Sequence, residues 1–165
     1  LLLDAIASAA GTEIAFSNGW RYGAPVPPGE MTVENLWNII PTNPPVSTVE
    51  LSGAEIREML EEQVEHTFAA DPFMQMGGNV KRIRGLTLYL KVQNPPGHRI
   101  EELFAGEEPI DPEHIYRCAF VTEQGVPSRY GRNRKHLSIH AIDALDDWLA
   151  SHIAGEAKRQ TVLAI

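Results

Sequence analysis

The segment SGAEIREMLEEQVEHTF, residues 52–68, constrains the fold more than any other part of this chain. Ser52 and Glu55 have the spacing of a capping box, in which each side chain satisfies a backbone amide that the first helical turn leaves unpaired. Apolar residues then recur at helical spacing at Ile56, Met59, Leu60, Val64 and Phe68. The pattern therefore predicts a helix that packs one face against a core and ends near Asp71 and Pro72.

Shorter segments on either side alternate between helical and strand patterns. Helices are expected at residues 2–10, at 33–40 with Thr32 as N-cap, and at about 139–153. Strands are expected at residues 12–16, 46–51, 86–92, 100–104 and 115–121. Because several strands are joined by links of hairpin length, the order favours an α+β fold, with a layered mixed sheet and packed helices, over a doubly wound one.

The composition is that of one globular domain spanning residues 1–165. A net charge of −8 argues against a general nucleic-acid or membrane-surface binder, since neutralising phosphates requires a basic face. No apolar run approaches the roughly 20 residues that span a bilayer. The single cysteine, Cys118, lies in an apolar strand pattern and is expected to be buried and inert. The chain opens on leucines in mid-pattern, so we expect it to be a segment of a longer protein.

Two short segments concentrate positive charge in this acidic chain. They hold seven of the fourteen lysine and arginine residues, namely Lys81, Arg82, Arg84, Arg129, Arg132, Arg134 and Lys135. Such concentration is compatible with an anion site, and equally with solvated loop charges that pair with nearby Asp and Glu. Just before the first segment, Gln75 with Gly77 and Gly78 has the composition of a turn, and the lysine spacing of a phosphate loop is absent.

The histidines do not indicate an active site within this chain. His136 and His140 are four residues apart, a spacing that suits one metal ion at the start of a helix, but no third ligand is evident. No serine or cysteine motif makes another histidine the base of a catalytic triad. We therefore predict no catalytic residue and no metal ligand in the chain.

The segment SNGWRYGAPVPPGE, residues 17–30, places Arg21 between Trp20 and Tyr22, with Gly19 and Gly23 outside them. Glycines permit a tight turn, and a guanidinium group is a planar, permanently charged fork that suits phosphate or carboxylate. The residues alone support two interpretations of Arg21 equally. Arg21 contacts a ligand anion, or it packs between the rings and pairs with a carboxylate of the domain.

The order of motifs resembles the C-terminal domain of the 5′-nucleotidase family. The motifs are a helix and strand leading to the Arg21 turn, a proline-terminated helix, the Ser-Gly-led helix, the FMQMGG turn, the GHRI turn and the YRCAFVT strand. The resemblance covers Leu1 to about Leu149. It implies a two-domain bacterial hydrolase whose N-terminal metallophosphoesterase domain holds two divalent metals and the catalytic residues. This chain is then the substrate-binding half, inactive alone, in a periplasmic or secreted protein.

The resemblance assigns roles at individual positions. Arg21 matches the arginine that meets the substrate near its phosphate, and Asn18 is similar to the asparagine of the same turn. Gln75, Gly77 and Gly78 match the turn beside the base-binding cleft. The family stacks a nucleobase between two phenylalanines. This sequence has Thr42 at the first of these positions and Glu123 or Gln124 at the second.

The form GWRYG looks more like the thiosulfate-oxidising branch of the same superfamily, whose members hydrolyse a sulfonate bound to a cysteine of a carrier protein. In either case the expected ligand is a small phosphorylated, nucleotide-like or oxyanion substrate, with no nucleic acid or membrane partner. Trp20, Tyr22, Arg129 and Arg132 are expected to shape the cleft. Two further alternatives are a non-catalytic module that binds anions or nucleotides, and a structural domain without a ligand.

Overall fold

The computed structural model describes residues 1–18, 25–26, 28–29, 31–76, 80–152 and 161–164. Its helices are α1 (Leu2–Ala10), α2 (Val33–Ile39), α3 (Gly53–Phe68), the short 3-10 helix η1 (Pro72–Met74) and α4 (Ala141–Ser151). Its strands are β1 (Ile14–Ser17), β2 (Pro45–Ser52), β3 (Arg82–Arg84), β4 (Leu86–Leu90), β5 (Ile100–Ala105), β6 (Glu108–Pro109), β7 (Ile115–Phe120), β8 (Arg132–His140) and β9 (Thr161–Ala164).

The strands form two sheets. The larger has the order β3-β1-β7-β2-β8, and the smaller has the order β6-β5-β4-β9. In the larger sheet β1 and β7 run parallel, whereas β3, β2 and β8 pair antiparallel with their neighbours. The sheets are mixed and the helices pack on them, so the predicted α+β class is confirmed.

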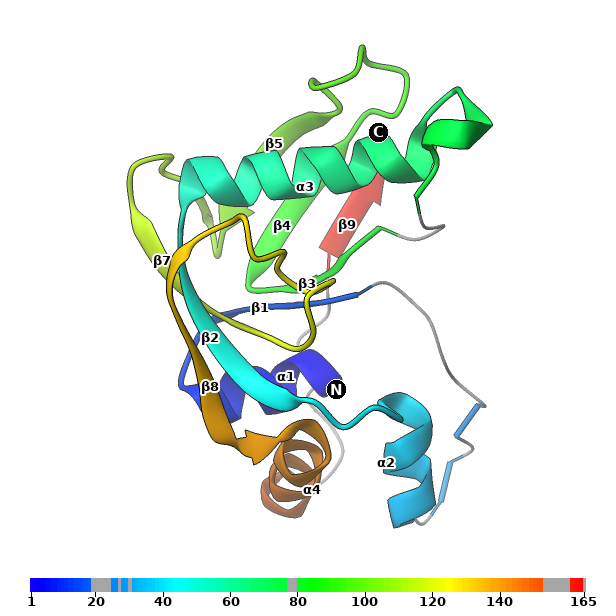
Figure 1. The fold of residues 1–165 in the computed structure, drawn as a ribbon, viewed down its shortest axis with the longest axis vertical. Helices are drawn as coiled ribbons and strands as arrows, with labels where there is room; N and C mark the ends of the chain where they lie inside the picture. The colour runs from blue at the N-terminus through cyan, green and yellow to red at the C-terminus, as the bar shows by residue number, and fades with distance from the viewer. Residues whose placement is uncertain (19–24, 27, 30, 77–79, 153–160, 165) are drawn as a thin grey trace.

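The central part of the larger sheet is covered on both faces (Figure 1). One face packs against α3 and the smaller sheet, and this core includes Phe16 of β1, Phe120 of β7 and Leu60 of α3. The opposite face packs against α1, α2 and α4, and here β1 and β7 contribute Ala15 and Ala119. Because alternate residues of a strand point to opposite faces, one short strand supplies both cores.

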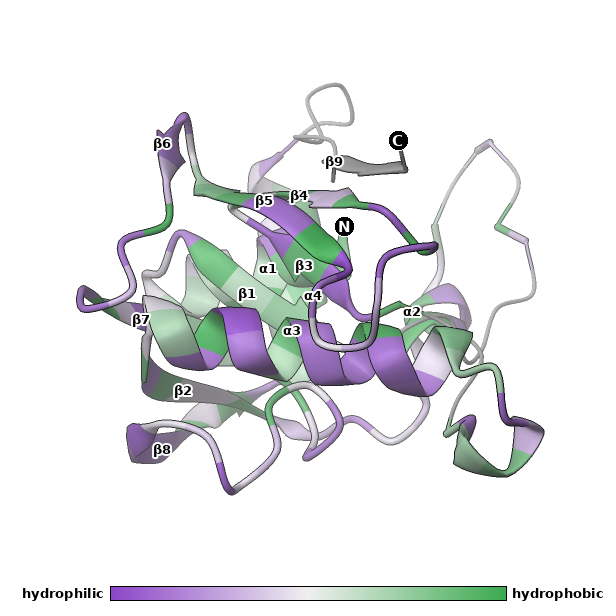
Figure 2. Ribbon diagram, turned by 90° about the horizontal axis from the view of Figure 1, so that it is seen from above, coloured by the Kyte–Doolittle hydropathy of each residue, from purple (hydrophilic) through white to green (hydrophobic). Residues whose placement is uncertain are grey.

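Helix α3 has the capping box that the sequence predicts. The Ser52 hydroxyl accepts a hydrogen bond from the Glu55 amide at 3.1 Å, and the Ser52 amide donates to the Glu55 carboxylate at 2.8 Å. The expected apolar face is buried from Ile56 to Val64, while Phe68 in the last turn is partly exposed. Figure 2 shows hydrophobic and hydrophilic stretches alternating along this helix, as expected where only one side meets a core.

Two strands occur where the sequence pattern indicates loops or a helix start. β3 covers the basic residues after the FMQMGG turn, and β8 covers Arg132–His140. His136 and His140 therefore lie in a strand, and the final helix begins at Ala141 rather than Ile139. Charged residues are tolerated here because β8 is an edge strand, where most side chains face solvent and pairing with β2 supplies the backbone hydrogen bonds.

Polar side chains of α3 fasten it to the start of β5. The Glu61 carboxylate accepts hydrogen bonds from the backbone amides of Arg99 at 2.6 Å and Ile100 at 2.8 Å. Glu65 forms an ion pair with the buried Arg99 side chain at 3.1 Å, and Arg57 donates to the Ile100 carbonyl at 3.0 Å. These contacts fix the smaller sheet against the helix.

Replacing Glu61 with alanine should therefore destabilise the fold. Two amides at the entry of β5 would lose their acceptor, and we expect the free energy of unfolding to fall by about 2 kcal/mol. Urea denaturation measures this loss. Glu58→Ala is the matched control, because Glu58 is exposed on the same helix. Equal losses in both variants would contradict the assigned role of Glu61.

Candidate functional site

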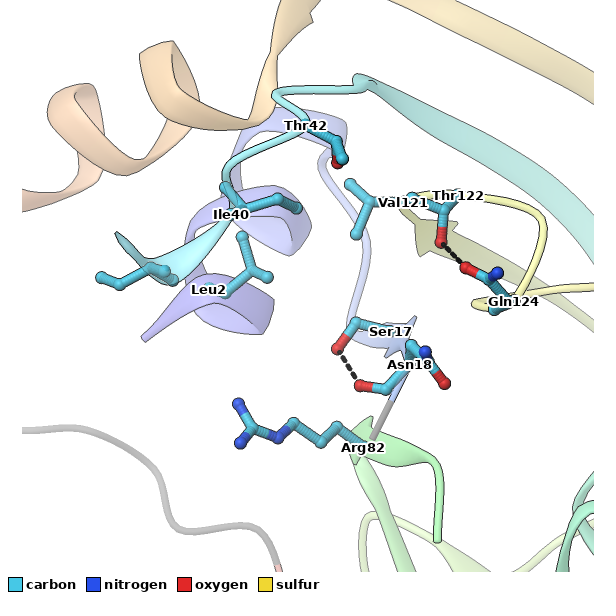
Figure 3. Close-up of a pocket in the computed structure, with 10 residues that line it drawn as sticks. Leu2, Ser17, Asn18, Ile40, Thr42, Arg82, Val121, Thr122 and Gln124 are labelled. Atoms are coloured by element: carbon cyan, nitrogen blue, oxygen red, sulfur yellow. Dashed lines mark hydrogen bonds between the residues drawn. The ribbon is translucent and has the colours of Figure 1, made fainter. Parts of the chain in front are cut away.

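A pocket of about 290 Å³ opens where β1 and β7 end (Figure 3). Parallel strands bring their carboxyl ends to the same edge of a sheet, and the loops that follow them supply side chains there. β3, which runs antiparallel to β1, begins at this edge with Arg82 opposite Ser17. The lining residues are Leu2, Ser17, Asn18, Ile39, Ile40, Thr42, Arg82, Val121, Thr122 and Gln124.

Both apolar and polar side chains line this pocket. In Figure 3, Leu2 and Ile40 lie on one side, and Thr122 and Gln124 lie on the other. The Thr122 hydroxyl donates to the Gln124 side-chain oxygen at 3.4 Å. A pocket of this kind can hold a ligand with one apolar side and several hydrogen-bonding groups.

Arg82 supplies the positive charge among the lining residues. Its side chain is exposed, and its guanidinium group makes no hydrogen bond or ion pair with any residue in the described part of the chain. Figure 3 shows the guanidinium group reaching past the end of β3 toward the Leu2 side of the pocket. A guanidinium group in this state can bind a phosphate or sulfonate without first breaking an internal pair.

The structure places some of the sequence-predicted residues at this pocket and others elsewhere. Asn18 and Thr42 line it. Gln75 does not, and its side-chain amide donates to the Ala69 carbonyl at 2.9 Å on the exposed turn after α3. The predictions for Arg21, Trp20, Tyr22, Gly77 and Gly78 fall outside the described residues.

Most of the basic residues that the sequence singles out have structural partners. Arg129 pairs with Glu62, and Arg132 pairs with Glu50 at 3.7 Å. Neither arginine is among the residues that line the pocket. These two ion pairs agree with the alternative in which the basic residues pair with nearby Asp and Glu rather than form an anion site.

Two further arginines of the same segments also have internal partners. The Arg84 Nε atom lies 2.8 Å from the Asp4 carboxylate, which joins β3 to α1. Arg134 donates to the carbonyls of Val126, at 3.0 Å, and Pro127, at 2.9 Å. Both side chains therefore hold segments of the fold together.

Sequence reasoning did not identify Arg82 individually, because nothing in its local pattern separates it from the other basic residues. The same is true of Lys81, which is 5% exposed and whose ammonium group donates to two backbone carbonyls. The signal that distinguishes them is strand alternation, which sends Arg82 toward the pocket and Lys81 toward the interior. That signal becomes usable only once residues 82–84 are known to be a strand.

Cys118, His136 and His140 are the remaining residues that the sequence singles out for reactivity or metal binding. Cys118 is fully buried, so the expected burial is confirmed, and burial raises the pKa of its thiol to about 12, which disfavours the reactive thiolate. His136 and His140 instead hydrogen-bond to Ser47 and to the Asn43 carbonyl, at 2.8 and 2.9 Å. Within the described ranges, no group of three or more His, Cys, Asp or Glu side chains is placed to hold a metal ion.

The family 5′-nucleotidase, C-terminal domain, matches residues 1–122 of this 165-residue chain. The chain belongs to this family. Domains of the 5′-nucleotidase C-terminal family are attached to metallophosphoesterase domains, and the described residues of this one contain no metal site. They also contain no helix with the length and apolar character needed to cross a bilayer.

Individual relatives agree with this assignment. The fold matches the sulfate thiohydrolase SoxB of Thermus thermophilus with a TM-score of 0.83 and 28% identity, over 99% of this chain and 31% of that one. It matches a 5′-nucleotidase precursor from the same species with a TM-score of 0.75 and 24% identity, over 98% and 34% of the two chains.

A sequence relative is the trifunctional nucleotide phosphoesterase protein YfkN of Bacillus subtilis (strain 168). It is 28% identical over 95 residues, which cover 58% of this chain and 6% of the relative. The chain thus spans about a third of the two solved relatives and a small part of the Bacillus protein.

The buried Lys81 predicts that stability rises with pH in the alkaline range. Burial lowers the pKa of Lys81 to about 8 from its ordinary value of 10.5. Between these two values the unfolded chain holds a proton that the folded chain has released, so the free energy of unfolding increases with pH. The contribution should be about 1 kcal/mol for the first pH unit above the folded pKa.

Urea denaturation of the wild type and of Lys81→Met at pH 7, 8, 9 and 10 isolates this contribution from the other titrating groups. As pH rises through this range, the free energy of unfolding of the wild type should increase relative to that of Lys81→Met. Parallel pH profiles would mean that Lys81 is not held in a charge-excluding site.

Proposed function

We propose that this chain is the substrate-binding domain of a two-domain, metal-dependent phosphoester hydrolase. The observation that carries the proposal is the pocket at the ends of β1 and β7, which combines neutral polar groups with an arginine that has no partner among the described residues. Membership of the 5′-nucleotidase C-terminal family supports a hydrolase as the parent protein. The roles of this chain are to bind and orient a substrate.

Two arginines are proposed as contacts for the phosphate or a similar oxyanion. Arg82 lines the pocket directly. Arg21 follows the lining residue Asn18 by three positions, so covalent geometry alone limits the distance between their Cα atoms to about 11 Å. A pair of guanidinium groups near one anion provides charge-assisted hydrogen bonds that a neutral ligand cannot use.

The remaining lining residues favour a substrate without a stacked purine. Thr42 and Gln124 both line the pocket, at the positions where the family resemblance implies aromatic rings. No lining residue in the described part of the chain is aromatic. Hydroxyl and amide groups at these positions offer hydrogen bonds instead of a π surface.

A second candidate is hydrolysis of a sulfonate bound to a protein carrier. It is favoured by the missing aromatic pair together with the match to SoxB, a sulfate thiohydrolase by name. The same arginines would then bind a sulfonate, which presents three oxygens in a similar arrangement. A non-catalytic binding module is the outcome if no substrate is turned over by the parent protein.

The divalent metals and the catalytic residues are assigned to the preceding metallophosphoesterase domain, and no chemical step is assigned to this chain. The partner of the pocket is therefore that domain, and a small phosphorylated or sulfonated substrate lies between the two. A periplasmic or secreted location belongs to the same proposal.

Neutralising Arg82 should weaken anion binding without unfolding the chain. We expect Arg82→Gln to reduce affinity for inorganic phosphate and thiosulfate about tenfold, which corresponds to losing one charge-assisted interaction. Isothermal titration calorimetry on the 165-residue chain measures it. Arg117→Gln is the matched control, because Arg117 is exposed on β7 and does not line this pocket. Equal affinities for wild type and Arg82→Gln would overturn the anion role.

Restoring aromatic rings should convert the pocket toward nucleotides. Thr42→Phe combined with Gln124→Phe is expected to increase affinity for AMP about thirtyfold, since each of the two stacking contacts contributes roughly 1 kcal/mol. Affinity for thiosulfate should not increase. Calorimetric titration with AMP, adenosine and thiosulfate tests this, and an unchanged AMP affinity would show that the two positions do not flank a base.

A further inference from the structure

Lys81 lies directly before β3 and points away from the pocket that Arg82 lines. Its ammonium group donates hydrogen bonds to the carbonyl oxygens of Gln124, at 2.5 Å, and Gly125, at 2.9 Å. Its own amide donates to the Gln63 side chain of α3 at 2.6 Å. One residue thus connects α3, the start of β3 and the loop after β7.

The loop that Lys81 holds, residues 121–125, is tightly turned. Thr122 has a φ of 62°, in the left-handed region that few non-glycine residues adopt. A Cβ atom at Gly125 would lie 2.5 Å from the Val121 carbonyl oxygen and 3.3 Å from that of Phe16. Several carbonyl oxygens therefore crowd around the end of β1, and their dipoles repel one another unless a donor lies among them.

The ammonium group of Lys81 donates to two further carbonyls of this loop, those of Gln124 and Gly125. Charge-assisted hydrogen bonds are shorter and stronger than neutral ones, and they are stronger still where water is excluded. The groups that contact Lys81 are neutral, because Gln63 offers an amide and the loop offers carbonyls. Burial alone accounts for its lowered pKa. Since this one side chain donates to two successive carbonyls of the loop, the loop conformation depends on it.

The same loop forms one wall of the pocket, because Thr122 and Gln124 both line it (Figure 3). We propose that Lys81 is a positioning residue that fixes this wall and so determines which ligands the pocket accepts, an inference that rests on the proposed function of the pocket. Lys81 binds the backbone of Gln124 from behind, and the side chain of Gln124 lies on the pocket side. Arg82, next in sequence, holds the anion. Of the two adjacent basic residues, Arg82 therefore binds the anion, and Lys81 determines which ligands fit the pocket.

The test compares Lys81→Met, which keeps the length of the side chain and removes its donors, with Lys91→Met. Lys91 is exposed after β4, so its variant controls for the loss of one charge. Amide hydrogen exchange is measured first. In Lys81→Met we expect exchange at residues 122–126 to accelerate about tenfold or more, while the α3 amides stay protected. The Gly125 amide, which donates to the Thr122 carbonyl at 3.0 Å, is the most direct reporter.

Calorimetric titration with AMP and inorganic phosphate then tests selection. If the wall is mispositioned, the affinity for AMP should fall by a factor at least several times larger than the affinity for phosphate. Phosphate binding should change less, because it depends on the arginines. Gly125→Ala, which crowds the loop while Lys81 is intact, should give the same split in affinity. Equal losses for both ligands, or acceleration of exchange throughout α3 and β2, would reduce Lys81 to a structural role and overturn the proposal.

The two proposals fail in different ways. If the wild-type chain binds neither probe, the proposed function of the pocket is wrong, and the exchange data still decide whether Lys81 fixes the loop. If the wild type binds the probes and Lys81→Met has normal exchange at residues 122–126, the pocket stands and the positioning role is wrong.

Discussion

The parallel pair of β1 and β7 is the constraint on which the rest of this structure depends. Both strands lie inside the larger sheet, and where they pair, at Ile14–Phe16 and Cys118–Phe120, alternate residues face two different cores. Phe16 and Phe120 lie in the core that packs against α3, whereas Ala15 and Ala119 are small and lie in the core that packs against α1. A one-residue shift of either strand would exchange these sets and leave both cores wrongly packed.

The same pairing creates the pocket. Since β1 and β7 end together, residues 17–18 and 121–124 are delivered to one edge, and antiparallel β3 begins there with Arg82. Nothing in this arrangement requires the loops to be similar in sequence to those of relatives. The lining residues Thr42 and Gln124 can therefore change while the packing of the sheet is unchanged, and solved relatives with this fold have names that indicate different substrates.

Local signals were sufficient for the parts of the fold that are stabilised locally. The α3 helix was predictable because the residues of its capping box and of its apolar face all lie within one short segment, residues 52–68. β3 and β8 were not, because their charged sequences resemble loops and their stability comes from pairing with β1 and β2, which lie far away in the chain. The pocket depends on those pairings. Consequently Asn18 and Thr42 were found through family resemblance, whereas Arg82 required the strand to be seen.

Charge placement distinguishes the pocket from the rest of this acidic surface. Arg84, Arg129 and Arg132 each pair with a carboxylate, and Arg134 is held by carbonyls, so their charges are largely compensated within the fold. Arg82 has no such partner among the described residues, and Lys81 behind it is surrounded by carbonyl dipoles. With a net charge of −8, the chain repels anions at long range. The proposed anion binding must therefore arise at short range, from the Arg82 guanidinium group, which has no internal partner among the described residues.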